Sequence, residues 1–472
     1  MKHIAHTGAG MALRLFITLL ILLLIHSGSL TMAAETNTPI SHVIIIVQEN
    51  HSFDNVFGTY PTANGTLIDN ITSQLQRVDG IPTNVCLPLG TSCIPPYYEN
   101  ATNTENPVEG QTVYENDWDN GSMDGFAINS GPQSLAYFDY HQFASYWAYA
   151  EEYGLADNYF ASALSTTTPN RLIILAGDTP VSYNYGPPPY MPYNRTILNQ
   201  LSTHNISWGY FDFLPPFEPN QTYPINYLAG IDSNALSRIQ NVSSFLQDLQ
   251  AGDNLPSVNF VNALGADTFD EHPPFNVTKG ELWAVSIINA VMSSAYWNST
   301  AIFLTYDEGG GYYDHVPPPQ LLNIDHGFPR PLHGYGERVP LLVISPFAKE
   351  NYVSNQLLNH MSILRFIEYN WNLDPLNQNV ANSNNLLDFF YFGSAPRLPI
   401  ILGTNGAYST TSYPLPIQIP LNSLPYSSNN STISGQPWKP PTIIPIAILS
   451  IPLLLAVVVI AWRKNRAKDG IR

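Results

Sequence analysis

The sequence has few charged residues, and basic residues are the scarcest. The 18 Lys and Arg residues stand against 36 Asp and Glu, which gives a formal net charge of −18. Nucleic-acid binding needs clustered Lys and Arg to neutralise phosphates, so we expect no nucleic-acid partner. Charged residues make up only 11% of the chain, and much of the polarity comes from uncharged side chains. This composition is typical of a protein surface outside the cell.

Cysteine is almost absent. The chain has 2 cysteines, Cys86 and Cys93, both in the stretch CLPLGTSC. They are close enough to form one disulfide that closes a short loop. In an oxidising compartment we expect a disulfide rather than two free thiols. Apolar residues, by contrast, are plentiful at 44% of the chain. That content excludes a disordered chain and suffices for one large core or two moderate ones.

The two ends of the chain carry long apolar runs that predict a membrane location. Residues 1–34 pass from basic residues through LFITLLILLLI to small residues, which is typical of a signal peptide, with an uncleaved anchor as the alternative. Residues 442–462 supply about 20 apolar residues without charge, enough for a transmembrane helix. The tail at 463–472 is basic and is therefore expected in the cytoplasm. Everything between is predicted to lie outside the cell.

Composition divides the extracytoplasmic part into a folded head and a stalk. We expect a head domain at 35–402, with a polar, turn-rich loop insertion at about 60–115, and a Pro/Ser/Asn-rich stalk at 403–441. Sequons for N-glycosylation are spread over the chain, which agrees with this placement. They include Asn64, Asn70, Asn100, Asn194, Asn220, Asn241, Asn276, Asn298 and Asn430.

Short aliphatic runs alternate with helical patterns in the head. The predicted strands are 42–47, 206–211, 257–264, 301–306 and 340–346. The predicted helices are 134–154, 169–177, 242–252, 279–294 and 359–371. Continuous apolar strands separated by helices predict an α/β fold of three layers, α/β/α, around a mainly parallel sheet. In such sheets the working site lies at the carboxyl ends of the strands.

Polar side chains follow two of these strands directly. Glu49 and Asn50 leave the first, and Asp307 and Glu308 leave the strand at 301–306, just before three glycines. Glycine permits a sharp departure from the sheet and lets a ligand approach the backbone. Four oxygen donors at two strand ends predict a site for a hard divalent cation. The alternative is that Asp307 and Glu308 only cap a turn.

A third element is LSTTTPNRLIILAG, residues 164–177. Pro169 suits the first turn of a helix, and a threonine hydroxyl just before it would sit where backbone N–H groups can hold an anion. Threonine is also a common structural N-cap. Beside a metal, the same hydroxyl could attack phosphorus or sulfur. Arg171 could clamp the anion or brace the helix, and the sequence leaves both open.

Histidines form the fourth group of candidates. His272 in DEHPP and His315 in YDHVPP rank above the other histidines, because nearby prolines restrict their local geometry. Each could donate a proton to a leaving group or orient an oxyanion.

Together these motifs resemble a known family of phosphoesterases. The matching segments are HVIIIVQENHSFDNVFGTYP, GSMDGFA, the stretch from YWAYAEEYG to PNRLIILAG, DEHPP, TAIFLTYDEGGGYYDHVPPP, GERVPLLVISPFAK and NHMSILRFIE. The family contains phosphatidylcholine-type phospholipases C and a metal-dependent acid phosphatase, within the alkaline phosphatase-like superfamily. The likeness spans residues 42 to about 370 in the family's order.

The resemblance implies a role for each candidate. Glu49, Asn50, Asp307 and Glu308 would bind a divalent metal of unknown identity together with the nucleophile. The nucleophile stands two residues before the proline, which favours Thr167 over Thr166 and Thr168. The implied reaction passes through a phosphoryl-threonine intermediate. The remaining implied site residues, for the leaving group, its orientation and substrate binding, are His272, His315, Asp314, Asn170, Arg171 and His360.

Two departures from the family pattern bear on the site. Relatives often carry a histidine before MDGF, where this chain offers Glu115, Asn116 and Asp117. The residue after Glu308 is frequently His or Asn, and here it is Gly309, which removes one polar contact.

Three functions follow as hypotheses. The first is a membrane-anchored acid phosphatase that releases phosphate from monoesters. The second is a phospholipase C-like phosphodiesterase, and the third is an inactive, glycosylated adhesion protein. The presence of Thr167 and all four proposed ligands favours an enzyme.

Overall fold

The structure is a computed structural model that describes residues 35–63, 66–67, 77–184, 189–213, 224–252, 254–263, 269–320, 323–324 and 332–403. The expected signal peptide, transmembrane helix and basic tail lie outside these residues, as does the stalk apart from residue 403. Among the described helices, none combines the length and apolar character that crossing a bilayer requires.

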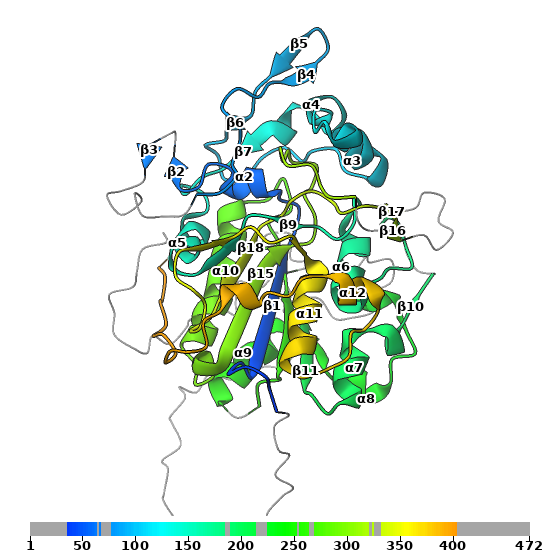
Figure 1. The fold of residues 1–472 in the computed structure, drawn as a ribbon, viewed down its shortest axis with the longest axis vertical. Helices are drawn as coiled ribbons and strands as arrows, with labels where there is room; N and C mark the ends of the chain where they lie inside the picture. Colours follow the sequence, from blue (N-terminus) through cyan, green and yellow to red (C-terminus); the bar gives the residue numbers. More distant parts are fainter. Residues whose placement is uncertain are drawn as a thin grey trace, which may run out of the picture. The chain divides into compact units, whose positions relative to one another are not determined.

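An eight-stranded sheet forms the centre of the fold (Figure 1). Its strands, in spatial order, are β13 (Ile239–Asn241), β11 (Trp208–Asp212), β14 (Val258–Asn262), β1 (His42–Gln48), β15 (Thr300–Tyr306), β18 (Leu341–Ile344), β8 (Gly154–Ala156) and β19 (Tyr352–Ser354). From β13 to β15 all neighbours are parallel. Only β18 runs antiparallel to its neighbours, so the predicted mainly parallel sheet is confirmed.

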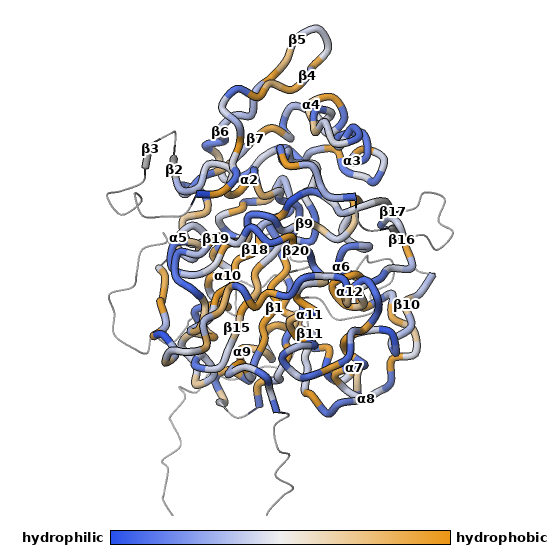
Figure 2. Tube along the Cα trace, in the orientation of Figure 1, coloured by the Kyte–Doolittle hydropathy of each residue, from blue (hydrophilic) through white to orange (hydrophobic). Residues whose placement is uncertain are grey.

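The central strands form because their apolar runs are buried on both faces. In β1 every residue after His42 is buried, and Ile45 lies between Phe260 of β14 and Phe303 of β15. Figure 2 shows this apolar centre as orange strands. All five predicted strands are present in the sheet. The sequence did not predict β13, β8 and β19, because each has only 3 residues and shows no periodic pattern of apolar residues.

Helices cover both faces of the sheet. One group consists of α10 (Val277–Met292), packed against α5 (Ala144–Glu152) and α9 (Val242–Ala251). The other consists of α11 (His360–Asn370), packed against α6 (Thr167–Ala176) and α12 (Gln378–Asn382), with α7 (Ile197–Thr203) beside α6. These two groups and the sheet make the three predicted layers (Figure 1).

Small elements between β1 and α5 form a cap beyond the carboxyl end of β1 (Figure 1). The cap, residues 77–138, contains β4 (Leu87–Leu89), β5 (Ser92–Ile94), β6 (Tyr97–Tyr98), α3 (Gln111–Trp118), α4 (Phe126–Asn129) and β7 (Ala136–Tyr137). A disulfide joins Cys86 to Cys93 across the β4–β5 hairpin. The cap has a hydrophobic cluster of its own, to which Tyr313 contributes from the loop after β15. The described residues 77–115 of the segment expected as a loop insertion are therefore part of a cap attached to the strand-end loop.

A buried arginine ties the cap, the loop after β15 and the β8 region together. The Arg338 side chain is 1% exposed and forms ion pairs with Asp54, Asp157 and Asp314 at 3.0, 3.2 and 3.2 Å. Its guanidinium also donates to the carbonyl of Asp79 at 2.9 Å. Three buried carboxylates thus share this guanidinium, and His315 adds a second pairing to Asp54 at 2.7 Å.

We expect Arg338→Met to destabilise the fold by about 3–5 kcal/mol, because it leaves buried carboxylates without a positive partner. The free energy of unfolding by urea measures this. The matched control is Arg195→Met, since the Arg195 side chain is 53% exposed and pairs with a single carboxylate, Asp178, which is hydrogen-bonded to the Thr179 N–H as well. The control change should cost less than about 1 kcal/mol. Equal losses in the two variants would contradict the structural weight given to Arg338.

Candidate metal centre and active site

The register of β1 and β15 brings the two predicted acidic pairs together. Gln48 pairs with Tyr306 at the ends of the strands, so Glu49 and Asp307 leave the sheet side by side. The backbone N–H of Asp307 donates to the Gln48 carbonyl at 3.1 Å. The N–H of Asn50 in turn faces Asp307 Oδ1 at 3.4 Å. Residues more than 250 positions apart in the chain therefore share one edge of the sheet.

A left-handed residue and a glycine make this close approach possible. Asn50 has φ +67°, a conformation that Asn tolerates better than most residues. Gly310 has φ +63°, and a β-carbon there would lie 2.4 Å from the Asn50 carbonyl oxygen and 2.5 Å from its Cβ. Only glycine can occupy position 310 without pushing the two loops apart.

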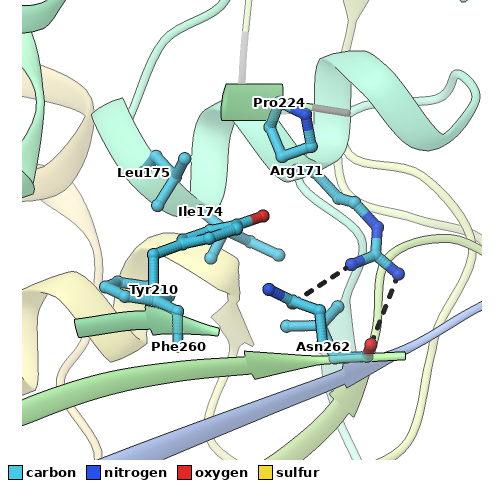
Figure 3. A pocket seen from close by; sticks show the side chains of 8 residues that line it. Arg171, Ile174, Leu175, Tyr210, Pro224, Phe260 and Asn262 are labelled. Carbon is cyan, nitrogen blue, oxygen red and sulfur yellow. Dashed lines mark hydrogen bonds between the residues drawn. The ribbon is translucent and has the colours of Figure 1, made fainter. Parts of the chain in front are cut away.

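Arg171 braces the strand ends from α6. Its Nε donates to Asp307 Oδ2 at 2.8 Å, and a terminal nitrogen lies 3.5 Å from Glu49 Oε1. It also donates to Asn262 at 3.3 Å and to the carbonyls of Val47 and Gln48 at 3.3 Å each. Figure 3 shows this guanidinium above Asn262. Because the side chain is only 3% exposed and its donors are engaged, the geometry favours a bracing role over an anion clamp.

The cavity in Figure 3 is too small for a substrate. Its volume is about 10 Å³, close to the lower limit for a single water molecule. It is lined by Arg171 and Asn262 and by apolar and aromatic side chains that include Tyr210 and Phe260. The cavity therefore lies beneath the brace and is no active-site cleft.

Two oxygens at the strand ends suit a cation. Asn50 Oδ1 and Glu308 Oε1 are both buried and have no hydrogen-bond partner among the described residues. The other Glu308 oxygen accepts from the Gly310 N–H at 2.7 Å, which orients the carboxylate. Buried acceptors without a donor are costly unless a cation or a proton satisfies them. With Glu49 and Asp307 at the same strand ends, these residues fit a hard divalent metal in their chemistry, although the Glu49, Asp307 and Glu308 oxygens do not all lie within 4.8 Å of one another.

The electrostatics agree with this fit. Burial raises the pKa of Glu49 well above its usual range, the negative charge of Asp307 raises it further, and Arg171 opposes the shift. Burial likewise raises the pKa of Glu308 well above its usual range, with added repulsion from Asp307 and Glu109. One guanidinium cannot neutralise this many carboxylates, so the site attracts protons or a metal.

A second group of acidic side chains lies closer together but is already satisfied. In the part of the chain that the structure describes, Asp54, Asp314 and His315 have ligand atoms within 4.8 Å of one another. The Asp54 oxygens accept from His315 Nδ1 at 2.7 Å and from Arg338 at 3.0 Å. Those of Asp314 accept from the Asp54 N–H at 3.0 Å and the Val316 N–H at 2.9 Å. With Arg338 as the cation, this group is an ion-pair network rather than a metal centre.

Thr167 is the first residue of α6, as the motif predicts. Arg171 follows four residues later on the same face of the helix, so the first turn of α6 lies near the strand ends. The loop before Thr167 is held by Asn170, whose Nδ2 donates to the carbonyls of Ala163 and Ser165 at 3.1 and 3.0 Å. The Asn170 Oδ1 accepts from the Ala163 N–H at 2.9 Å. Asn170 therefore positions the threonine loop, and its amide is not directed to a substrate.

His272 lies beside the metal centre. Its Nδ1 is 2.6 Å from the Pro273 carbonyl, and its Nε2 is 3.5 Å from Glu109 Oε1. The same Glu109 oxygen accepts from Asn50 Nδ2 at 2.9 Å. His272 is 29% exposed, so it is accessible to a substrate.

Three expected site residues lie elsewhere. His360 is fully buried and uses both ring nitrogens, one at 2.9 Å from the Tyr306 carbonyl and one that accepts from the Ser162 N–H at 3.3 Å. Asp314 and His315 make their hydrogen bonds within the Arg338 network. This geometry favours structural roles for all three.

Further residues at the site had no clear sequence signal. Glu109 comes from the cap, and its separation of 59 positions from Asn50 carries no periodic signal. Glu337 fills the space beside Gly309, where a β-carbon would lie 3.0 Å from Glu337 Cβ. Burial raises the pKa of Glu337 to about 8, and the charge of Asp117 adds to the shift. The Glu337 carboxyl group thus lies beside Gly309, the position where the sequence predicted that a polar contact is missing.

Comparison with known proteins identifies the family. A model of the Phosphoesterase family matches residues 40–374, which is most of the chain. This chain belongs to the Phosphoesterase family. The resemblance inferred from the motifs is therefore confirmed.

Curated relatives of this family member are named phospholipases C. It is 26% identical over 396 residues to a non-hemolytic phospholipase C of Burkholderia pseudomallei, covering 71% of this chain and 55% of that protein. It is 26% identical over 461 residues to phospholipase C A of Mycobacterium tuberculosis, covering 80% and 86%. It is 26% identical over 369 residues to non-specific phospholipase C4 of Arabidopsis thaliana, covering 68% and 65%. The chain spans about half the length of some of these relatives.

Likeness to solved structures is slight. A protein in the alkaline phosphatase superfamily from Vibrio parahaemolyticus matches with a TM-score of 0.34 and 12% identity, over 60% of this chain and 72% of that one. These matches therefore add no support to the three-layer architecture, which is shown by the sheet and helices of this chain.

Metal affinity should rise with pH. Because the pKa values of Glu49 and Glu308 are raised in the metal-free protein, their protons must leave before a metal binds. We expect a gain of about tenfold per pH unit for each proton released, at pH values below the raised pKa. Free Mn²⁺ measured by electron paramagnetic resonance across a pH series gives the affinity. An affinity that does not change with pH would contradict the assignment of these ligands.

His315 should act on stability rather than on turnover. Burial lowers its pKa, but the hydrogen bond and charge of Asp54 outweigh burial and raise the pKa from 6.5 to about 9. The stabilisation is therefore complete below pH 6.5 and is lost as the pH rises through about 9. His315→Gln should lower the free energy of unfolding most below pH 6.5 and least above pH 9. A folded variant with unchanged stability and lost activity would restore the catalytic role.

Proposed function

We propose that this chain is a metal-dependent phosphoesterase that hydrolyses phosphate esters through a phosphoryl-threonine intermediate on Thr167. The observation that carries the proposal is the pair of buried, unpartnered oxygens on Asn50 and Glu308 at the strand ends, near the start of α6. Membership of the Phosphoesterase family supports the reaction class.

Each residue has a defined task in this proposal. Glu49, Asn50, Asp307 and Glu308 hold the metal, and Arg171 keeps Glu49 and Asp307 in place. A divalent metal bound there would lower the pKa of a nearby hydroxyl and neutralise phosphate oxygens. Thr167 Oγ1 gives its proton to solvent and attacks phosphorus as the ester bond breaks, and the imidazolium form of His272 gives its Nε2 proton to the departing alkoxide. Water then releases phosphate from Thr167.

The substrate class has two candidates. An acid phosphatase acting on monoesters is the first, because the site needs nothing beyond a phosphate and a leaving group. A phospholipase C-like phosphodiesterase is the second, and the names of the relatives at about a quarter identity favour it. An inactive adhesion protein is disfavoured, since the ligand set and Thr167 are all present. The terminal apolar segments support a membrane-anchored enzyme with its head outside the cell.

Replacing Thr167 tests the nucleophile. We expect Thr167→Ala to reduce phosphate-ester hydrolysis at least about 10³-fold, because no other group takes over the attack. Thr167→Ser is the matched control and should keep measurable activity, since it retains a hydroxyl. Phosphate release from a chromogenic monoester and its diester, with and without a chelator, is the measurement. Unchanged hydrolysis by Thr167→Ala, or full activity in chelator, would overturn the mechanism.

A further inference from the structure

We propose that Glu109 is a positioning residue that orients the Asn50 amide, so that its oxygen faces the metal, and links Asn50 to His272. The proposal rests on the proposed function in that Asn50 is taken as a metal ligand. Glu109 reaches the strand ends from the cap, outside the segments whose motifs predicted the site.

The hydrogen bond itself defines which way the amide points. Glu109 Oε1 lies 2.9 Å from Asn50 Nδ2, and a carboxylate can only accept hydrogen bonds. The nitrogen end of the amide must therefore face Glu109. The oxygen end then points the other way, where Asn50 Oδ1 is buried and has no partner among the described residues. An amide turned around would present N–H groups to a cation, which is repulsive.

The Asn50 end of this contact is buried. Asn50 is fully buried, and the Glu109 side chain is only 22% exposed. Removing the carboxylate would leave a buried amide nitrogen without an acceptor, so both orientations of the amide would become comparable in energy. Partners that orient metal ligands in this way typically change metal affinity 10–100-fold when they are removed.

The same oxygen also faces His272. With Nδ1 of His272 at 2.6 Å from the Pro273 carbonyl, Nε2 is the nitrogen left for a substrate, and it lies 3.5 Å from Glu109 Oε1. One carboxylate oxygen thus stands between the metal ligand and the proposed proton donor.

Mn²⁺ binding by the full-length protein in detergent tests whether Glu109 orients Asn50. This measurement needs no substrate. We expect Glu109→Ala to weaken Mn²⁺ affinity about 10–100-fold. Glu109→Gln should stay within about threefold of wild type, because its amide oxygen can still accept from Asn50 Nδ2. Glu105→Ala is the matched control, since Glu105 is exposed in the same segment. Thermal unfolding of the metal-free variants checks that each one is folded.

A double-mutant cycle separates positioning from a general effect on the fold. If Glu109 acts through Asn50, Glu109→Ala should cause no further loss of Mn²⁺ affinity in an Asn50→Ala background. Additive losses would overturn the proposal, as would a folded Glu109→Ala variant that binds Mn²⁺ like wild type.

Hydrolysis by the same variants tests the link between Glu109 and His272. Glu109→Gln should keep Mn²⁺ affinity but slow an alkyl phosphate more than a nitrophenyl phosphate, because only the poorer leaving group needs the proton from His272. Equal slowing of both esters would overturn the link to His272. Wild-type protein that binds Mn²⁺ but hydrolyses no ester would refute the proposed function alone. Wild-type protein that binds no Mn²⁺ would refute both.

Discussion

The buried ion pair between Arg171 and Asp307 is the interaction on which the site depends. Arg171 belongs to α6, the helix that begins at Thr167, and Asp307 belongs to the end of β15. A pair taken out of water needs good geometry and further hydrogen bonds, and here the guanidinium finds them on Asn262 and on the carbonyls that end β1. One side chain therefore fixes the helix that begins at Thr167 against both strand ends.

The same pair leaves the site short of positive charge. Arg171 engages Asp307 and Glu49, while Glu308 keeps a buried oxygen without a donor. Burial, with added repulsion from neighbouring carboxylates, raises the pKa values of Glu49 and Glu308 in the metal-free state. The Arg338 network shows the opposite arrangement, because its carboxylates share an internal cation and accept N–H donors. This difference separates the candidate metal centre, which lacks positive charge, from a network whose charges are already paired.

Much of the fold was predictable because its signals are local. Apolar runs such as that of β1 mark strands buried on both faces, and all five predicted strands are in the sheet. The short strands β8, β13 and β19 were not predictable, since 3 residues carry no pattern and their pairing decides their conformation. The places of candidate site residues in the fold were predictable where a motif follows a strand or begins a helix, as at Glu49 and Thr167. They were not predictable for Glu109 or Glu337, which come from loops without a period.

The sequence by itself determined which residues end the central strands, and with them the acidic pairs, the glycines after Glu308 and the threonine before Pro169. Only the tertiary structure decided which hydrogen-bond and ion-pair partners the remaining polar side chains have. It assigned Asp314 and His315 to Arg338, His360 and Asn170 to backbone groups, and Glu109 to the metal centre. The physical reason is that the role of a polar side chain depends on the group with which it pairs. Partners distant in the chain meet only when the sheet, the helices and the cap have packed.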